Sequence, residues 1–458
     1  MSPNKNANNT TWNSNRWKGI NRPYTHADVD RLKGTVTVEY SLARAGAERF
    51  WKVLRSEPFI PALGAVNGNQ AVEMAEAGLK AVYLSDCPLT SGNPGTYGVQ
   101  PPQAHHVPGA VRAVNSALLR ADQVSHSRRQ ARFDWMLPIV AEGDTEFGGS
   151  MSSFESTKEL IEAGAAAIHF DDQLPATRRC GQIGGKVLIP MEEAIQKLVA
   201  ARLAADTLGV PTVIIARTDA DSASYLSSGS DRRDQPFLTG EISPGYNGSY
   251  NVFRGGMDAA IARALAFAPY ADMLWCETAD LNKEDARKFA NAIHAQFPGK
   301  MLAYNCSPSF HWRAKMNEDD LACFQRDLAA MGYRFQFISL AGYHTLNLSM
   351  YQFAKDYAQS GMTAYSQIQQ LELEMAKQLG HSAVGTKDDV GTDYFEAISS
   401  AITHTPRTDR RQPRPRVHEH FEVDTLDYND GEATERTPMP HLYPSLEPTQ
   451  LPMAAAAD

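Results

Sequence analysis

The stretch Ala166–Gln173, with the sequence Ala-Ala-Ile-His-Phe-Asp-Asp-Gln, passes from apolar residues directly into two carboxylates. A short apolar run of this kind is consistent with a buried strand. Similar runs return along the chain and alternate with amphipathic stretches of helical length, which is the pattern of repeated β-α units. The number of these units therefore decides the fold.

Eight apolar runs are strand candidates, namely residues 61–66, 81–85, 137–141, 166–170, 212–216, 272–276, 301–305 and 335–340. Between them lie stretches with apolar residues at helical spacing, residues 70–79, 111–124, 154–163, 192–207, 258–268, 283–296 and 318–330. Eight strands alternating with helices predict an α/β fold of the (β/α)8 barrel type, with additional N-terminal and C-terminal helices. A doubly wound open sheet is the alternative.

The chain is expected to have three parts. Residues 1–17 are polar and are predicted to be a disordered leader, and residues 18–404 form the barrel domain with a helical C-terminal segment. Residues 405–458 are rich in proline and charge, which predicts a largely disordered tail.

Helices and long loops extend the barrel pattern. Residues 43–54, 345–379 and 393–403 are predicted to be helical. Residues 87–108 and 222–256 are rich in glycine with proline or serine, and we interpret them as long loops. Each loop could be a lid over the site or a surface insertion.

Composition excludes several classes of protein. The 458 residues carry a net charge of −9 with scattered Lys and Arg, so no nucleic-acid-binding surface is expected. No apolar run approaches the roughly 20 residues needed to span a membrane, and no signal peptide is present. The five cysteines lack the spacing of zinc sites and favour a reducing compartment, the cytoplasm.

Polar residues collect where the strand candidates end, and the active site of such a barrel lies at that rim. The rim residues are Ser85-Asp86, Glu142-Gly143-Asp144, Asp171-Asp172, Arg217-Thr218-Asp219, Glu277-Thr278, Asn305 to Ser309, and Ser339 with His344. Carboxylates after three consecutive strand candidates suit Mg²⁺, which takes oxygen ligands. The alternative is that these acidic residues cap helices and end loops.

Two further groups indicate an anionic substrate. Arg217 can bind a carboxylate with a bidentate fork, and Asn305, Ser307 and Ser309 add neutral donors. The alternative is a structural ion pair of Arg217 with Glu277 or Asp219.

Cys180 lies beside Arg178 and Arg179, and positive charge favours a reactive thiolate. The alternative is an inert, packed thiol. Together these groups describe a site for a small polycarboxylate bound to Mg²⁺, in which a C–C bond next to a carboxylate breaks and the thiol protonates the carbanion.

From about Trp17 to Thr403 the chain resembles the isocitrate lyase family, a branch of the isocitrate lyase and phosphoenolpyruvate mutase superfamily of barrel enzymes. The matching stretches are Gly184–Pro190, Ile215–Ala220, Leu302–Phe310 and Phe335–Ile338. The resemblance implies an enzyme of the glyoxylate cycle that cleaves isocitrate to succinate and glyoxylate with Mg²⁺. It also implies a homotetramer that exchanges C-terminal helices.

The resemblance assigns roles to single residues. Cys180 would be the acid that protonates the succinate carbanion, with Arg178, Arg179 and Gln182 beside it in the catalytic loop. The residues that would bind substrate are Ser85, Asp86, Gly181, Arg217, Glu277, Asn305, Ser307, Ser309 and Ser339. The residues that would bind the metal are Glu142, Asp144 and Asp171.

The chain departs from the family pattern in this pocket. The family's Lys-Lys-Cys-Gly-His is Arg178 to Gln182 here, and Arg is not an equivalent base for Lys. Glutamine at position 182 cannot titrate as histidine does. Ser85-Asp86-Cys87 replaces Ser-Gly-Trp, and Ser339 replaces Thr.

The metal-binding acids are also exchanged, because Glu142 stands for Asp and Asp144 for Glu. These changes keep three alternatives open. The first is the same chemistry on an alkyl-substituted isocitrate, such as 2-methylisocitrate, which gives succinate and pyruvate. The second is a catalytically silent subunit, and the third is hydrolytic C–C cleavage of an oxo-diacid.

Overall fold

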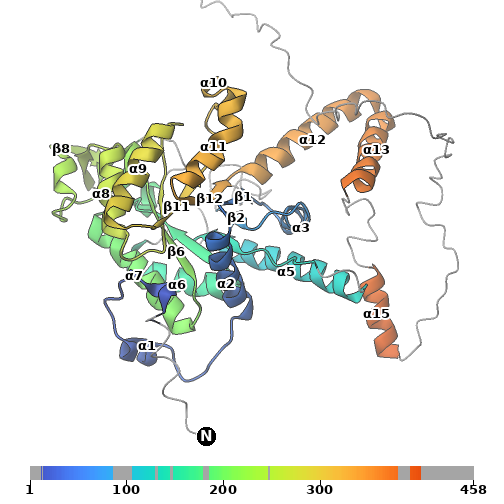
Figure 1. Ribbon diagram of the computed structural model, residues 1–458, viewed down its shortest axis with the longest axis horizontal. Coiled ribbons are helices and arrows are strands. Elements are labelled where there is room, and N and C mark those ends of the chain that lie inside the picture. Colours follow the sequence, from blue (N-terminus) through green and yellow to red (C-terminus); the bar gives the residue numbers. More distant parts are fainter. Residues whose placement is uncertain are drawn as a thin grey trace, which may run out of the picture. The chain divides into compact units, whose positions relative to one another are not determined.

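A closed barrel of eight parallel strands forms the centre of the protein (Figure 1). The computed structural model describes residues 12, 14–85, 106–128, 133–144, 148–178, 185–245, 248–379 and 392–403. The barrel strands are β1 (Ile60–Gly64), β2 (Val82–Leu84), β3 (Ile139–Glu142), β4 (Ala167–Phe170), β6 (Val213–Thr218), β10 (Met273–Cys276), β11 (Met301–Asn305) and β12 (Tyr333–Ile338). Because β1 pairs with both β2 and β12, the sheet has no edge, and the barrel prediction is confirmed.

The barrel interior and the outer layer follow from the period of two in each strand. On β6, Val213 and Ile215 belong to one core cluster with Trp275 and Phe337, whereas Ile214 and Ala216 belong to the larger cluster shared with the helices. The first set fills the barrel, and the second set packs against the surrounding helices. A polar residue two positions beyond the inner set therefore reaches the C-terminal mouth of the barrel.

Helices cover the outside of the barrel through their apolar faces. On α9 (Lys283–Gln296) the buried residues are Ala286, Phe289, Ala290 and Ile293, at helical spacing, and Asn282 caps the first turn by accepting from two backbone N–H groups. The other helices around the barrel are α2 (Ser41–Ser56), α3 (Gly68–Glu76), α5 (His106–Ser127), α6 (Gly149–Ala163), α7 (Met191–Leu208), α8 (Met257–Phe267) and α11 (Glu318–Ala330).

Further helices lie at both ends of the sequence, as expected. They are α1 (His26–Leu32), α12 (Ala341–Ser360), α13 (Met362–Leu379) and α15 (Thr392–Thr403), with a short α10 (Trp312–Lys315) after β11. Gly361, at φ 53°, separates α12 from α13. Within the described residues, no helix is long and apolar enough to cross a membrane.

The interpretation of residues 222–256 as a loop was wrong. This segment contains β7 (Ala223–Leu226), β8 (Leu238–Gly245) and β9 (Gly248–Phe253). With β5 (Lys186–Leu188) they form a second sheet in the order β5-β7-β9-β8. Glycine and serine hid the strands because the exposed face of an antiparallel ribbon needs no apolar residues. Most of the other predicted loop, residues 87–108, lies outside the described residues.

The ends of several predicted elements shift by one or two residues. Strand β6 extends through Thr218, so Arg217 lies within the strand and not after it, and Glu142 is likewise the last residue of β3. The predicted leader ends earlier than expected, because Asn15–Trp17 is a 3₁₀ helix with Trp17 buried. The predicted tail, residues 405–458, lies outside the described residues.

Candidate active site

The strand period places most of the predicted site residues at one mouth of the barrel. Each of them lies two positions after a residue of the barrel interior. These pairs are Tyr83 and Ser85, Val140 and Glu142, His169 and Asp171, Ile215 and Arg217, Trp275 and Glu277, Ala303 and Asn305, and Phe337 and Ser339. The sequence thus determines that these side chains share the C-terminal end of the barrel.

An aromatic layer closes the barrel beneath these residues. The Tyr83 ring stacks on Phe337, with 4.3 Å between centroids, and Trp275 lies edge-on to His169 and Phe337. Tyr83 Oη lies 2.9 Å from His169 Nε2. Burial lowers the pKa of His169 to about 4, so the imidazole is neutral near pH 7. The site therefore has a dry, uncharged floor.

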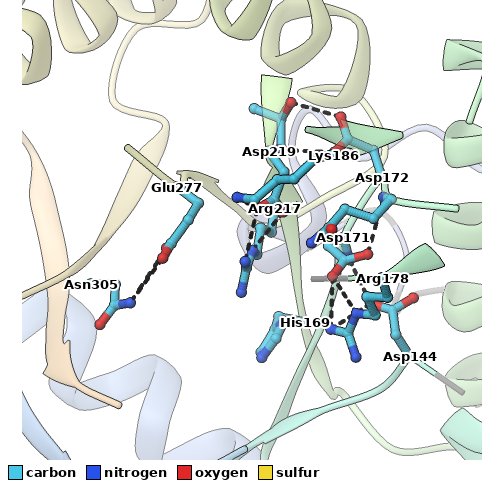
Figure 2. A network of polar contacts seen from close by, with 12 residues as sticks. Asp144, His169, Asp171, Asp172, Arg178, Lys186, Arg217, Asp219, Glu277 and Asn305 are labelled. Carbon is cyan, nitrogen blue, oxygen red and sulfur yellow. Dashed lines mark hydrogen bonds and ion pairs between the residues drawn. The ribbon is translucent and has the colours of Figure 1, made fainter. Parts of the chain in front are cut away.

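Three carboxylates meet around the guanidinium of Arg178. Two of them, Asp144 and Asp171, are labelled beside it in Figure 2. Arg178 Nε donates to Asp171 Oδ2 at 2.7 Å, and its Nη2 donates to Glu142 Oε1. The same nitrogen lies 4.0 Å from Asp144 Oδ2. We call Glu142, Asp144 and Asp171 the carboxylate cluster. The structure brings the three predicted metal ligands together, with an arginine side chain among them.

Lys197, on α7, is the second cation of the carboxylate cluster. Its ammonium donates to Asp144 Oδ1 at 2.5 Å and to the Asp171 carbonyl at 2.7 Å, and the Asp171 N–H donates to Asp144 Oδ2 at 2.6 Å. Burial alone would raise the pKa of Asp171, but Arg178 and then Lys197 lower it below its usual value. Burial raises the pKa of Asp144.

The carboxylate cluster fits a divalent cation by the chemistry of its donors. All its ligand atoms are oxygens on buried side chains, and a positive charge already joins Glu142 to Asp171. With Arg178 between these carboxylates, however, no group of three or more His, Cys, Asp or Glu side chains in the described part of the chain is arranged so that it could hold a metal ion.

Arg217 forms a bidentate ion pair with Asp219. Its Nε and Nη2 donate to the two Asp219 oxygens at 2.8 and 2.9 Å, and its guanidinium lies 4.5 Å from the centroid of the Trp275 ring. The structural ion pair left open by the sequence is therefore present. Nη1 makes no hydrogen bond among the described residues and is the group that remains for a ligand.

Glu277 and Asn305 form a second polar pair across the mouth of the barrel (Figure 2). Asn305 Nδ2 donates to Glu277 Oε1 at 3.2 Å, whereas its buried Oδ1 has no hydrogen-bond partner among the described residues. Burial is the main reason that the pKa of Glu277 is raised. An unpaired buried acceptor is costly unless a ligand donates to it.

The serines lie on either side of these charged groups. Ser85 Oγ donates to Glu142 Oε2 at 2.8 Å. Ser307 is buried, and its hydroxyl accepts from the Ser309 N–H at 3.2 Å. Ser339 follows β12, where its carbonyl oxygen would lie 1.8 Å from a Cβ built at Gly64. Only glycine at position 64 allows that close approach of β1 to Ser339.

The catalytic loop itself is not described by the structure. Arg179, Cys180, Gly181 and Gln182 lie outside the described residues, as does Asp86. Arg178 is the last described residue before the loop, and its contacts fix where the loop starts. The roles predicted for these five residues remain predictions.

Sequence reasoning missed both buried lysines of the site, Lys186 and Lys197. Lys186 is fully buried and donates to Asp219 Oδ1. Lys197 lies three positions after Ala194 and four before Ala201, both buried, so it occupies the apolar face of its helix. A lysine on a core-facing stripe was the signal that could have revealed it.

Comparisons with known proteins agree with this geometry. The sequence model of the isocitrate lyase family matches residues 5–247 and 245–405. Isocitrate lyase from Halalkalibacterium halodurans is 47% identical over 398 residues, covering 86% of this chain and 92% of that protein. Isocitrate lyase from Escherichia coli is 46% identical over 407 residues, covering 85% and 92%.

Solved structures share the fold at lower sequence identity. Phosphoenolpyruvate phosphomutase from Streptomyces platensis has a TM-score of 0.54 and 17% identity, covering 78% of this chain and 99% of that one. Oxaloacetate acetylhydrolase in complex with 3,3-difluorooxalacetate has a TM-score of 0.51 and 21% identity, covering 74% and 98%. The family model and the similar sequences decide the classification: the chain belongs to the isocitrate lyase family.

Proposed function

We propose that this protein is a carbon–carbon lyase that cleaves isocitrate to succinate and glyoxylate by a retro-aldol step. The observation that carries the proposal is the pairing of a carboxylate cluster with Arg217 and Asn305 at one mouth of the barrel. Such a mouth offers groups for a cation and groups for carboxylates side by side. The relatives named isocitrate lyase support the choice of substrate.

Charge balance supports a divalent cation in the site. Among the described residues, the cations Arg178, Lys186, Lys197 and Arg217 face the carboxylates Glu142, Asp144, Asp171, Asp219 and Glu277, which leaves one excess negative charge. A polycarboxylate would be repelled by that excess. We propose Mg²⁺, held by Glu142, Asp144 and Asp171, because these ligands are all carboxylates. When bound, the metal would polarise the substrate oxygens.

The chain's own residues have distinct tasks in the proposed reaction. The hydroxyl gives up its proton to a basic group of the site and becomes the carbonyl of glyoxylate as the bond between its carbon and the neighbouring carbon breaks. The electrons of that bond stay on the succinate carbon, and Cys180 supplies the proton there. Arg217 Nη1, Asn305, Ser307 and Ser309 hold the carboxylates. We assign the remaining contacts of the pocket to Ser339 and to Gly181, Gln182, Arg179 and Asp86, four residues that lie outside the described part of the chain. The aromatic layer under the site excludes water from the carbanion.

A second substrate, 2-methylisocitrate, is favoured by one feature of the sequence. Cys87, two positions after Ser85 in the sequence, stands where the family pattern has a tryptophan, and the Ser85 hydroxyl donates to the carboxylate cluster. A smaller side chain there leaves room for the extra methyl of pyruvate.

We also propose a homotetramer assembled through the C-terminal helices. Helices α12 and α13 expose large apolar side chains, among them Met350, Tyr351 and Met362, which are 59, 69 and 64% exposed. Exposed apolar patches of this kind mark interaction surfaces. Light scattering coupled to gel filtration tests the tetramer. The cytoplasm stays a prediction from the cysteine pattern.

One assay tests the proposed reaction and its alternative. The purified protein is given isocitrate and 2-methylisocitrate separately with Mg²⁺, and glyoxylate and pyruvate are measured. Glyoxylate from isocitrate, abolished by EDTA and restored by excess Mg²⁺, is the expected result. Pyruvate alone would move the protein to methylisocitrate cleavage. Silence with both substrates would contradict the proposed lyase function.

A further inference from the structure

Lys186 is a buried cation close to the candidate site that the proposed reaction does not use. It is the first residue of β5, its side chain is inaccessible to solvent, and its Nζ donates to Asp219 Oδ1. The same carboxylate accepts both Nε and Nη2 of Arg217. Asp219 is thus a single negative charge between two positive ones (Figure 2).

Asp219 is held in place from behind by a second carboxylate. Its N–H donates to Asp172 Oδ1 at 2.8 Å, and the neighbouring Thr218 hydroxyl donates to Asp172 Oδ2 at 2.7 Å. Arg263, fully buried on α8, forms an ion pair with Asp172 at 3.1 Å. The position of the Arg217 guanidinium therefore depends on Lys186 of β5, on Arg263 of α8, and on Asp172 and Asp219, which follow β4 and β6.

Charge decides what Arg217 can offer a ligand. A bidentate Arg217–Asp219 pair is neutral as a unit, and a neutral unit attracts a carboxylate weakly. Burial alone would raise the pKa of Asp219, but Arg217 and then Lys186 lower it below its usual value, so this carboxylate stays ionised. Without Lys186, the ionised Asp219 would cancel most of the charge of Arg217.

We propose that Lys186 is a positioning residue that neutralises Asp219, so that Arg217 stays oriented by its carboxylate and still presents a net positive charge to a substrate carboxylate. This inference rests on the proposed function, because it requires an anionic substrate. Glu277 also interacts electrostatically with Arg217, and its carboxylate makes the contribution of Lys186 more important.

The same molecule offers a matched control for the possibility that Lys186 has only a structural role. At the other end of the barrel, Asp272 lies between Arg16, at 2.6 Å, and Arg202, which is buried. Removing Arg202 leaves Asp272 paired with one cation, just as removing Lys186 leaves Asp219 paired with Arg217. Arg202→Met therefore reproduces the loss of a buried cation far from the site.

The test compares steady-state constants for isocitrate with Mg²⁺ in four proteins. Lys186→Met is expected to raise KM about tenfold or more, with a smaller change in kcat, because only the attraction of the anion is weakened. Lys186→Met/Asp219→Asn restores the net charge of +1 and should recover part of that loss. Arg202→Met should lower thermal stability and leave KM unchanged. An unchanged KM in Lys186→Met overturns the inference.

Two further measurements keep the outcomes separable. If Lys186→Met does not fold, Asp219→Asn and the double variant are compared, since they differ only in the charge of Lys186. The double variant should then have the higher KM, and equal values overturn the inference. Succinate binding by calorimetry gives the same comparison without turnover. A wild-type protein that neither cleaves isocitrate nor binds succinate overturns the proposed function, and the inference with it.

Discussion

Two buried carboxylates at opposite ends of the barrel have similar surroundings and different consequences. Asp219 lies between Arg217 and Lys186 at the C-terminal mouth, and Asp272 lies between Arg16 and Arg202 at the N-terminal end. Asp272 also accepts the Ile214 N–H at 2.8 Å, and both of its arginines stack on Trp17. Both oxygens of Asp272 are thus paired within the protein, although buried Arg202 Nε has no hydrogen-bond partner among the described residues.

The mouth of the barrel differs in its charge balance and in its unpaired acceptor. Arg217 Nη1 and Asn305 Oδ1 have no hydrogen-bond partner among the described residues, and the neighbouring carboxylates outnumber their cations. The comparison teaches that a buried ion pair is not itself a sign of function. What distinguishes the mouth is an excess of buried carboxylates together with an unpaired acceptor, Asn305 Oδ1.

The largest effect on activity is expected for a substitution that changes only the C-terminal mouth of the barrel. Cys180→Ser should lower kcat for isocitrate at least about a thousandfold, because a hydroxyl is a far weaker acid than a thiol and would protonate the carbanion poorly. Metal binding and the melting temperature should stay unchanged. Substantial residual turnover would remove Cys180 from the acid role.

The second-largest effect is expected for a substitution in the carboxylate cluster. Asp171→Asn should weaken Mn²⁺ binding, followed by electron paramagnetic resonance, by about a hundredfold, because a charged ligand is lost. Asp272→Asn, the same change at the other end of the barrel, should leave Mn²⁺ binding as in the wild type. Equal Mn²⁺ affinity in both variants would mean that the cluster does not hold the metal.

Asp272 provides the converse test, an effect on stability without an effect on the site. Asp272→Asn should lower the free energy of unfolding at pH 7 by about 3 kcal/mol, because it leaves two guanidiniums without their carboxylate. Isocitrate cleavage should be unaffected at a temperature where the variant is folded. A matching loss of activity would contradict the division between the two ends.

The pH dependence of that stability difference follows from the pKa of Asp272. Burial alone would raise this pKa, but Arg16 and Arg202 hold it well below its usual value. The ionised group therefore stabilises the fold fully above the pKa of about 4 of the unfolded chain. This contribution is lost progressively as the pH falls below that value toward the lower pKa of the folded state, so the difference in urea unfolding between variant and wild type should begin to shrink near pH 4 and keep shrinking at lower pH.

The smallest effect on activity is expected for a substitution at position 182, within the predicted catalytic loop at the mouth of the barrel. Gln182→His should raise kcat for isocitrate by about threefold to tenfold, because an imidazole can exchange protons near neutral pH and an amide cannot. Gln325→His, on the exterior helix α11, is the control and should change nothing. An unchanged or lower rate in Gln182→His would mean that the pocket has been rebuilt for another substrate.

The sequence by itself determined the barrel fold and which side chains lie at its C-terminal mouth. Alternation along Val213, Ile215 and Arg217, or along Met273, Trp275 and Glu277, is a local property of an extended chain. Parallel strands in a closed barrel then bring their C-terminal ends together without further information. For this reason Glu142, Asp171, Arg217, Glu277 and Asn305 could be predicted as one site.

Only the tertiary structure decided which charges pair. Lys186 reaches Asp219 from a separate small sheet, and Lys197 reaches Asp144 from the buried face of α7, so neither contact follows from spacing in the sequence. Arg217 has several carboxylates within possible reach, and the choice of Asp219 depends on how Asp172 and Arg263 fix that residue. Ion pairs join residues far apart in the sequence and depend on exact position, whereas strand alternation is local. For this reason the sequence revealed which residues share the mouth of the barrel, and only the tertiary structure revealed which of them pair.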